Sequence, residues 1–143
     1  MIFKRNRPKQ LEVNHIEDLE LLMEDGKPIL IDFFQHGCGP CKVMDGIVNE
    51  LAEEFVGGAH IVKVNVGRVP SIVQLFKIRS TPTFVVLGRS QKKISKKKHG
   101  GARSPQPMPS SVSPTPRWRT SGVIRKDQLI RILESNGGVR NQG

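Results

Sequence analysis

The sequence of 143 residues has few aromatic side chains, no tyrosine and no long apolar run. Aromatic residues make up 5% of the chain and apolar residues 36%, which supports one modest hydrophobic core but not a second. No segment approaches the roughly 18 apolar residues that a membrane-spanning helix needs, and the N-terminus lacks the apolar stretch of a secretory signal. We therefore expect a monomeric, single-domain protein that does not span a membrane and is cytoplasmic.

Cysteine is also scarce, because Cys38 and Cys41 are the only two in the chain. Two cysteines exclude a secreted scaffold with several disulfides. A Cys-x-x-Cys pair can be half of a zinc site, but such a site needs about four ligands, and there is no second cysteine pair and no closely spaced histidine pair. We expect neither a metal nor a bound cofactor, and any cysteine chemistry must come from this pair.

Acidic residues are missing from residues 89–121, which carry 9 basic side chains. Residues 1–9 carry 4 basic side chains, whereas residues 10–88 hold 6 basic and 11 acidic ones. The formal net charge of +10 therefore belongs to two segments and not to the body of the protein. This distribution argues against a nucleic-acid-binding fold.

The second basic segment combines the lysine run QKKISKKKHGGAR with SPQPMPSSVSPTP, which holds five of the ten prolines. Such a composition cannot bury enough apolar surface to offset the entropy of ordering it. We predict a basic tail over residues 1–10 and one domain over 11–143, interrupted by a flexible insertion at about 90–116. The insertion is either a solvated loop or a surface that docks on nucleic acid, anionic lipid or an acidic protein through residues 89–119, with Trp118 stacking on a base.

Helical and strand-like apolar patterns alternate along the chain, which is typical of an α/β domain with a central sheet. The patterns predict strands over residues 28–34, 61–66 and 83–87, and a final strand beginning near Trp118. They predict helices over residues 15–24 with Asn14 as the cap, from Pro40 to about Phe55, after Pro70, and over 126–135.

The sequence Cys38-Gly39-Pro40-Cys41 at the start of a predicted helix can close a small disulfide ring. Unpaired N–H groups and the positive end of the helix dipole favour the thiolate of Cys38, which makes it the better nucleophile. Cys41 must lose a proton before it can displace a mixed disulfide on Cys38. Asp32, in an otherwise apolar strand, is either the base for this step or a carboxylate that is hydrogen-bonded or solvated at a strand edge.

Two segments resemble the thioredoxin family. The segment 29–42, ILIDFFQHGCGPCK, resembles its active-site strand, turn and helix start, and the segment 79–87, RSTPTFVVL, resembles its cis-proline loop and following strand. The resemblance covers about residues 11–90 and resumes near Thr120, so that the basic, Pro/Ser-rich insertion precedes the last strand. It implies a thioredoxin-like fold, in which helices flank both faces of a central mixed β-sheet.

The resemblance also implies an activity, reduction of protein disulfides by dithiol–disulfide exchange, with thioredoxin reductase as the electron donor. In that reaction Cys38 attacks, Cys41 resolves and Asp32 assists Cys41, while Lys63 lies near Asp32 and influences its charge. The expected substrate-binding residues are Gly37, Gly39, Pro40, Thr81 and Pro82, of which Pro82 is cis and Thr81 offers main-chain hydrogen bonds to an extended peptide. The alternative is a thioredoxin-like binding module that uses its basic insertion.

Three positions near the cysteines matter for this resemblance. Gly37 stands where family members usually have tryptophan, and Phe34 stands where tryptophan is common. Gly37 removes a large apolar contact surface, which leaves open the target preference and the direction of the redox reaction. His36 either lowers the pKa of Cys38 when protonated or is an exposed turn residue without a role.

Overall fold

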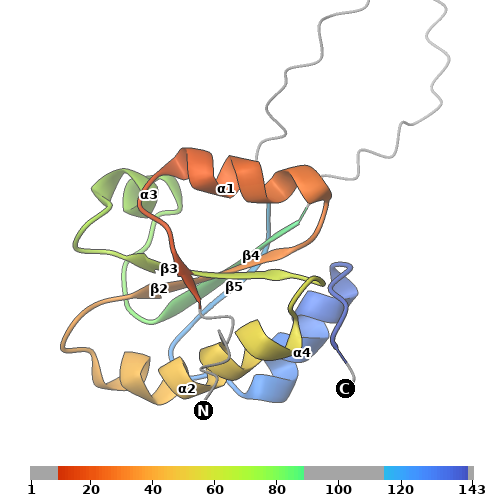
Figure 1. Ribbon diagram of the computed structural model, residues 1–143. Coiled ribbons are helices and arrows are strands. Elements are labelled where there is room, and N and C mark those ends of the chain that lie inside the picture. Colours follow the sequence, from red (N-terminus) through yellow and green to blue (C-terminus); the bar gives the residue numbers. More distant parts are fainter. Residues whose placement is uncertain (1–9, 89–114, 142–143) are drawn as a thin grey trace, which may run out of the picture.

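The computed structural model describes residues 10–88 and 115–141 (Figure 1). Along the chain its elements are β1 (Leu11–Glu12), α1 (Ile16–Leu22), the 3-10 helix η1 (Met23–Asp25), β2 (Ile29–Phe34), α2 (Gly39–Glu54), β3 (His60–Asn65), α3 (Pro70–Leu75), β4 (Thr83–Gly88), β5 (Thr115–Ser121) and α4 (Lys126–Ser135).

The strands form one five-stranded sheet in the order β1-β3-β2-β4-β5. β3 is parallel to both β1 and β2, whereas β4 is antiparallel to β2 and β5 is antiparallel to β4. Helices α1 and α3 cover one face, and α2 and α4 cover the other (Figure 1). The predicted fold class, a mixed sheet with helices on both faces, is confirmed.

The central strand β2 is apolar on both faces because both faces are covered. Ile29, Ile31 and Phe33 pack into the core beneath α1 and α3, whereas Leu30 packs into the core beneath α2 and α4. Successive side chains on a strand point to opposite faces, so Asp32 lies on the same face as Leu30. The one carboxylate of this strand is therefore directed towards the layer that carries α2.

Helix α1 differs from its prediction at both ends. Its N-cap residue is His15, which makes no side-chain cap hydrogen bond, so the prediction of Asn14 as the cap is wrong. A capping side chain must belong to the extended residue that precedes the first turn, and His15 takes that conformation with φ −134° and ψ 140°. The predicted end at residue 24 is replaced by η1, whose last turn closes on Gly26 with φ 76°.

Strands β4 and β5 are joined through residues 89–114, so most of the predicted insertion lies outside the described residues. Its last two residues belong to β5, which begins at Thr115. Gly88 and Thr115 are register partners across the two strands. The connection therefore leaves and re-enters the sheet at adjacent positions.

The C-terminal segment closes over the end of α2. The N–H of Val139 donates to the carbonyl of Gly58 at 3.2 Å, and the side chain of Asn141 donates to the carbonyl of Val56 at 2.7 Å. A methyl group on Gly58 would overlap the backbone carbonyl of Val139. Glycine at position 58 is thus required by the close approach of the two backbones.

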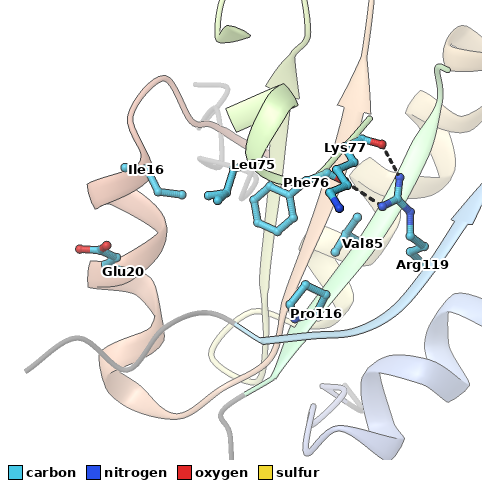
Figure 2. A pocket seen from close by; sticks show the side chains of 8 residues that line it. All are labelled: Ile16, Glu20, Leu75, Phe76, Lys77, Val85, Pro116 and Arg119. Carbon is cyan, nitrogen blue, oxygen red and sulfur yellow. Dashed lines mark hydrogen bonds between the residues drawn. The ribbon is translucent and has the colours of Figure 1, made fainter. Parts of the chain in front are cut away.

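A groove of about 410 Å³ lies between α1, the end of α3 and strand β5 (Figure 2). Arg119 borders it and donates to the carbonyl oxygens of Phe76 at 2.7 Å and Lys77 at 3.1 Å. These carbonyls belong to the C-cap residue of α3 and the residue after it, where the helix supplies no further N–H donors. Arg119 therefore fastens the edge strand β5 to the end of α3 and is not free to bind an anion with the same N–H groups.

Candidate active site

The two cysteines lie at the N-terminus of α2 and form a disulfide. Cys38 is the N-cap residue, and its sulfur accepts a hydrogen bond from the N–H of Cys41 at 3.2 Å. Pro40 occupies the first turn, where its missing N–H costs no helical hydrogen bond. Cys38 is half-buried, whereas Cys41 is 8% exposed, so Cys38 is the sulfur within reach of a partner molecule.

A second loop approaches Cys38 from the start of β4. The peptide bond between Thr81 and Pro82 is cis, as the resemblance implied. The sulfur of Cys38 lies 3.6 Å from the carbonyl oxygen of Thr81. The N–H of Gly122, just after β5, donates to the carbonyl of Pro82 at 2.8 Å, so the turn after β5 is joined to the loop that contacts Cys38.

Asp32 lies behind the disulfide on β2 and is 4% exposed. Its Oδ1 atom is buried and has no hydrogen-bond partner among the described residues. Burial, and to a lesser extent the negative charge of Asp45, raise the pKa of Asp32 from 3.8 to about 7, while the positive charge of Lys63 acts in the opposite direction. A carboxylate with this pKa can accept and return a proton near neutral pH.

Lys63 is the register partner of Asp32 on β3. Register partners share a face of the sheet, so both side chains lie on the side covered by α2. The ammonium group of Lys63 lies over the ring of Phe34, 5.4 Å from its centre. Lys63 thus supplies positive charge to the site from a position that the aromatic ring helps to hold.

These groups border one cavity of about 230 Å³ between the end of β2 and the first turns of α2. Its lining includes both cysteines, Asp32 and Lys63, which sequence analysis had singled out, and Asp45, which it had not. Asp45 follows Cys41 by four residues and so lies on the same helix face, a spacing that is visible in the sequence. The arrangement places a disulfide and a buried carboxylate in a single cavity.

A family model described as Thioredoxin matches residues 11–112. The chain belongs to the thioredoxin family. Thioredoxin from Haemophilus influenzae is 39% identical over 83 residues, which cover 56% of this chain and 78% of that protein. The chloroplastic M-type thioredoxin of Spinacia oleracea is 33% identical over 84 residues, which cover 59% of this chain and 46% of that protein. The chain thus spans about half the length of the plant thioredoxins that it matches.

Solved thioredoxin structures share the fold. A mutant thioredoxin from Halobacterium salinarum has a TM-score of 0.68 at 20% identity and covers 95% of this chain and 97% of its own. Thioredoxin f from spinach chloroplast has a TM-score of 0.64 at 22% identity and covers 94% of this chain and 98% of its own. The predicted membership and fold are therefore confirmed.

The residues that depart from the usual thioredoxin pattern lie at the rim of the cavity. Gly37 is exposed and has φ 81°, a left-handed conformation that suits glycine. His36 is exposed, and its ring meets the ring of Phe34 edge-on at 6.0 Å. Gly39 and Pro40, the other expected substrate-binding residues of this turn, are also exposed. The rim therefore presents a backbone turn where most thioredoxins present an indole ring.

The predicted polyanion-binding segment is only partly described, because residues 89–114 lie outside the described part of the chain. Trp118 is half-buried and packs against the core beneath α2 and α4. Its ring is therefore part of the fold, and stacking of this ring on a nucleic-acid base, one of the interpretations of the sequence, does not agree with its position. Arg119 is engaged at the end of α3.

Within residues 10–88 and 115–141, no group of three or more histidine, cysteine or acidic side chains is arranged to hold a metal ion. No helix in the same ranges is both long and apolar enough to cross a membrane.

Proposed function

We propose that this thioredoxin-family protein is a protein-disulfide reductase in which Cys38 attacks and Cys41 resolves. The observation that carries the proposal is the cavity that brings the Cys38–Cys41 disulfide together with Asp32. Family membership supports disulfide-containing proteins as substrates, and we propose thioredoxin reductase as the electron donor.

In the reduced protein the thiolate of Cys38 attacks one sulfur of a target disulfide. A bond forms between Cys38 and that sulfur, and the other target sulfur leaves as a thiolate. The N-terminal position of Cys38 on a helix of 16 residues stabilises the thiolate, because free N–H groups and the positive end of the dipole face it.

The second step regenerates the internal disulfide. Cys41 transfers its proton to the carboxylate of Asp32, directly or through one water molecule, and its sulfur bonds to Cys38. The bond between Cys38 and the target breaks, and the target sulfur leaves with the electron pair and takes up a proton. The target disulfide is thereby reduced to two thiols, and the protein dithiol is oxidised.

The main-chain groups around Pro82 support binding of an extended peptide beside Cys38. The Thr81 carbonyl already lies 3.6 Å from the Cys38 sulfur, and the Gly122 turn is joined to Pro82 by a hydrogen bond of 2.8 Å. A substrate segment that places its disulfide on Cys38 must pass this loop. Thr81 is then the residue whose backbone orients the peptide, in agreement with the role that the resemblance implies.

The test uses a disulfide-bonded protein such as insulin with dithiothreitol as the source of electrons. We expect the wild-type protein to accelerate the reduction, Cys38→Ser to be inactive, and Cys41→Ser to accumulate a mixed disulfide with the substrate that mass spectrometry detects. If Cys38→Ser reduces the substrate as fast as the wild type, or if it accumulates the mixed disulfide in place of Cys41→Ser, the proposal fails.

The reduction potential decides the direction of the reaction. A potential more negative than that of the glutathione couple supports a reductase, whereas a less negative one supports an oxidant or an isomerase. Equilibration of the Cys38–Cys41 pair with mixtures of reduced and oxidised glutathione measures this potential.

A further inference from the structure

We infer that Asp45, which borders the same cavity as Cys41 and Asp32, is a positioning residue of this site that acts on the proton transfer from Cys41 through Asp32. This inference rests on the proposed function for its catalytic consequence. The electrostatic relationship between the two carboxylates, however, does not depend on any substrate. Sequence analysis did not single out Asp45.

The position of Asp45 follows from helix geometry. It lies four residues after Cys41 on α2, so the two side chains project from the same face, one turn apart. The cavity that contains Cys41 and Asp32 is also lined by Asp45. Asp32 approaches this cavity from the sheet and Asp45 from the helix, with the resolving cysteine on the same wall as Asp45.

Gln10, which precedes β1, forms a hydrogen bond with Asp45 on α2. Gln10 is 6% exposed, and its side-chain amide donates to Asp45 at 3.4 Å and to Asn49 at 3.0 Å. The buried amide of Gln10 reaches Asp45 and Asn49 on α2, and it thereby restricts the Asp45 side chain at the mouth of the cavity. No ion pair to Asp45 occurs among the described residues, although Lys42 and Lys63 line the same cavity.

Several elements contribute other charged groups around Asp32. β3 contributes Lys63, which opposes the effect of Asp45, and β4 contributes the uncharged Phe84 as the register partner of Asp32. The cavity is also lined by His36 from the turn before α2 and Lys42 from its first turn. On β1, Glu12 pairs with Arg68 at 3.6 Å. Asp45 is the acidic group that raises the pKa of Asp32, after burial itself.

The chemical consequence concerns the second step of exchange. As the Cys41 sulfur bonds to Cys38 and the target thiolate leaves, the Cys41 proton must move to an acceptor. A neighbouring negative charge disfavours the ionised form of Asp32 and favours the form that has taken up this proton. Asp45 therefore increases the driving force for proton transfer from Cys41, and it does so through Asp32.

The direct test is the titration of Asp32 in the oxidised protein, where neither cysteine titrates. NMR chemical shifts of the side-chain carboxyl carbons follow Asp32 in the wild type, Asp45→Asn and Asp45→Glu. We expect Asp45→Asn to lower the titration midpoint of Asp32 by at least about 0.3 pH unit, a twofold change in proton affinity, and Asp45→Glu to restore it. The control is Glu17→Gln, which removes one negative charge on α1, across the sheet, and should leave the midpoint unchanged.

The kinetic test follows the release of substrate from the mixed disulfide as a function of pH. Asp45→Asn should shift the pH profile of this step downwards together with the Asp32 midpoint, whereas Glu17→Gln should leave the profile unchanged. An Asp32 midpoint in Asp45→Asn that equals that of Glu17→Gln, or one that rises, overturns the inference. A protein that shows the midpoint shift but reduces no disulfide contradicts the proposed function and leaves the relationship between the carboxylates intact.

Discussion

Asp32 and Lys63 are register partners on adjacent strands, yet no ion pair joins them in the described part of the chain. The ammonium group of Lys63 lies over the ring of Phe34, and Oδ1 of Asp32 remains buried without a hydrogen-bond partner. Burial is therefore the largest cause of the raised pKa of this carboxylate, and the charge of Lys63 lowers that pKa by a smaller amount. This separation allows Asp32 to be protonated near neutral pH, whereas a close ion pair would favour its ionised form.

Asp32→Asn should change the pH dependence of stability. The pKa of Asp32 is about 7 in the folded protein and 3.8 at its ordinary value, so the unfolded chain ionises first as the pH rises. The folded state binds the extra proton between these values, so the contribution of Asp32 to wild-type stability falls by roughly 4 kcal/mol as the pH rises through this range, and it levels off above pH 7. Urea denaturation should show that Asp32→Asn lacks this loss and exceeds the wild type most at pH 8. Parallel pH curves for the two proteins would contradict the prediction, and Asp127→Asn, an exposed change on α4, serves as the control.

Gly37→Ala should destabilise the oxidised protein by about 1 kcal/mol, because residue 37 has φ 81° and a Cβ disfavours this conformation. The added methyl group meets no atom within 4 Å, so the loss comes from the backbone alone. Gly39→Ala is the matched control, since Gly39 has equal space and no positive φ. Equal free energies of unfolding for the two variants would show that the turn relaxes without cost.

Two other glycines should respond in opposite directions. Gly46→Ala lies inside α2 with no atom within 4 Å of the new Cβ, and it should raise the free energy of unfolding by about 0.5–1 kcal/mol.

Gly58→Ala should lower the free energy of unfolding by about 1–3 kcal/mol, because the methyl group would overlap the Val139 carbonyl. Thermal unfolding measures both. A neutral Gly58→Ala would mean that the C-terminal segment is not held at Gly58.

Arg119→Ala should lower the free energy of unfolding by about 1–3 kcal/mol, since it leaves the carbonyls of Phe76 and Lys77 without their donor. Arg119→Lys should recover only part of this loss, because an ammonium group does not reproduce the guanidinium fork. Arg131→Ala, an exposed change on α4, should have little effect. If chemical denaturation gives the same value for the variants at positions 119 and 131, the hydrogen bonds of Arg119 at the edge of the groove in Figure 2 do not stabilise the fold.

Much of the fold was predictable because its main elements carry strong periodic patterns. The helix after Pro40 and the apolar run of β2 are long enough for the pattern to identify them. β1 was not predicted, because Leu11–Glu12 is too short to show a period of two. The Asn14 prediction failed because capping depends on the conformation of one residue, which composition does not determine.

Most residues of the candidate site were also predictable from the sequence, but Asp45 was not. The cysteine pair and the carboxylate Asp32 stand out in sequence, and the family resemblance added Lys63 and Pro82. Asp45 was missed because its relationship to Asp32 joins a helix and a strand across the core. Its spacing from Cys41 was visible, but only the tertiary structure shows that both carboxylates border one cavity.

Because Gly88 and Thr115 are register partners, the connection between them begins and ends at neighbouring positions of the sheet. Any polypeptide segment whose two ends lie one strand spacing apart can join these two residues. The free energy of closing such a loop grows only logarithmically, by about 0.6 kcal/mol for each doubling of its length. The interval between Gly88 and Thr115 is therefore a position at which chain can be gained, lost or exchanged for a foreign domain, while the sheet and the cysteine pair keep their geometry.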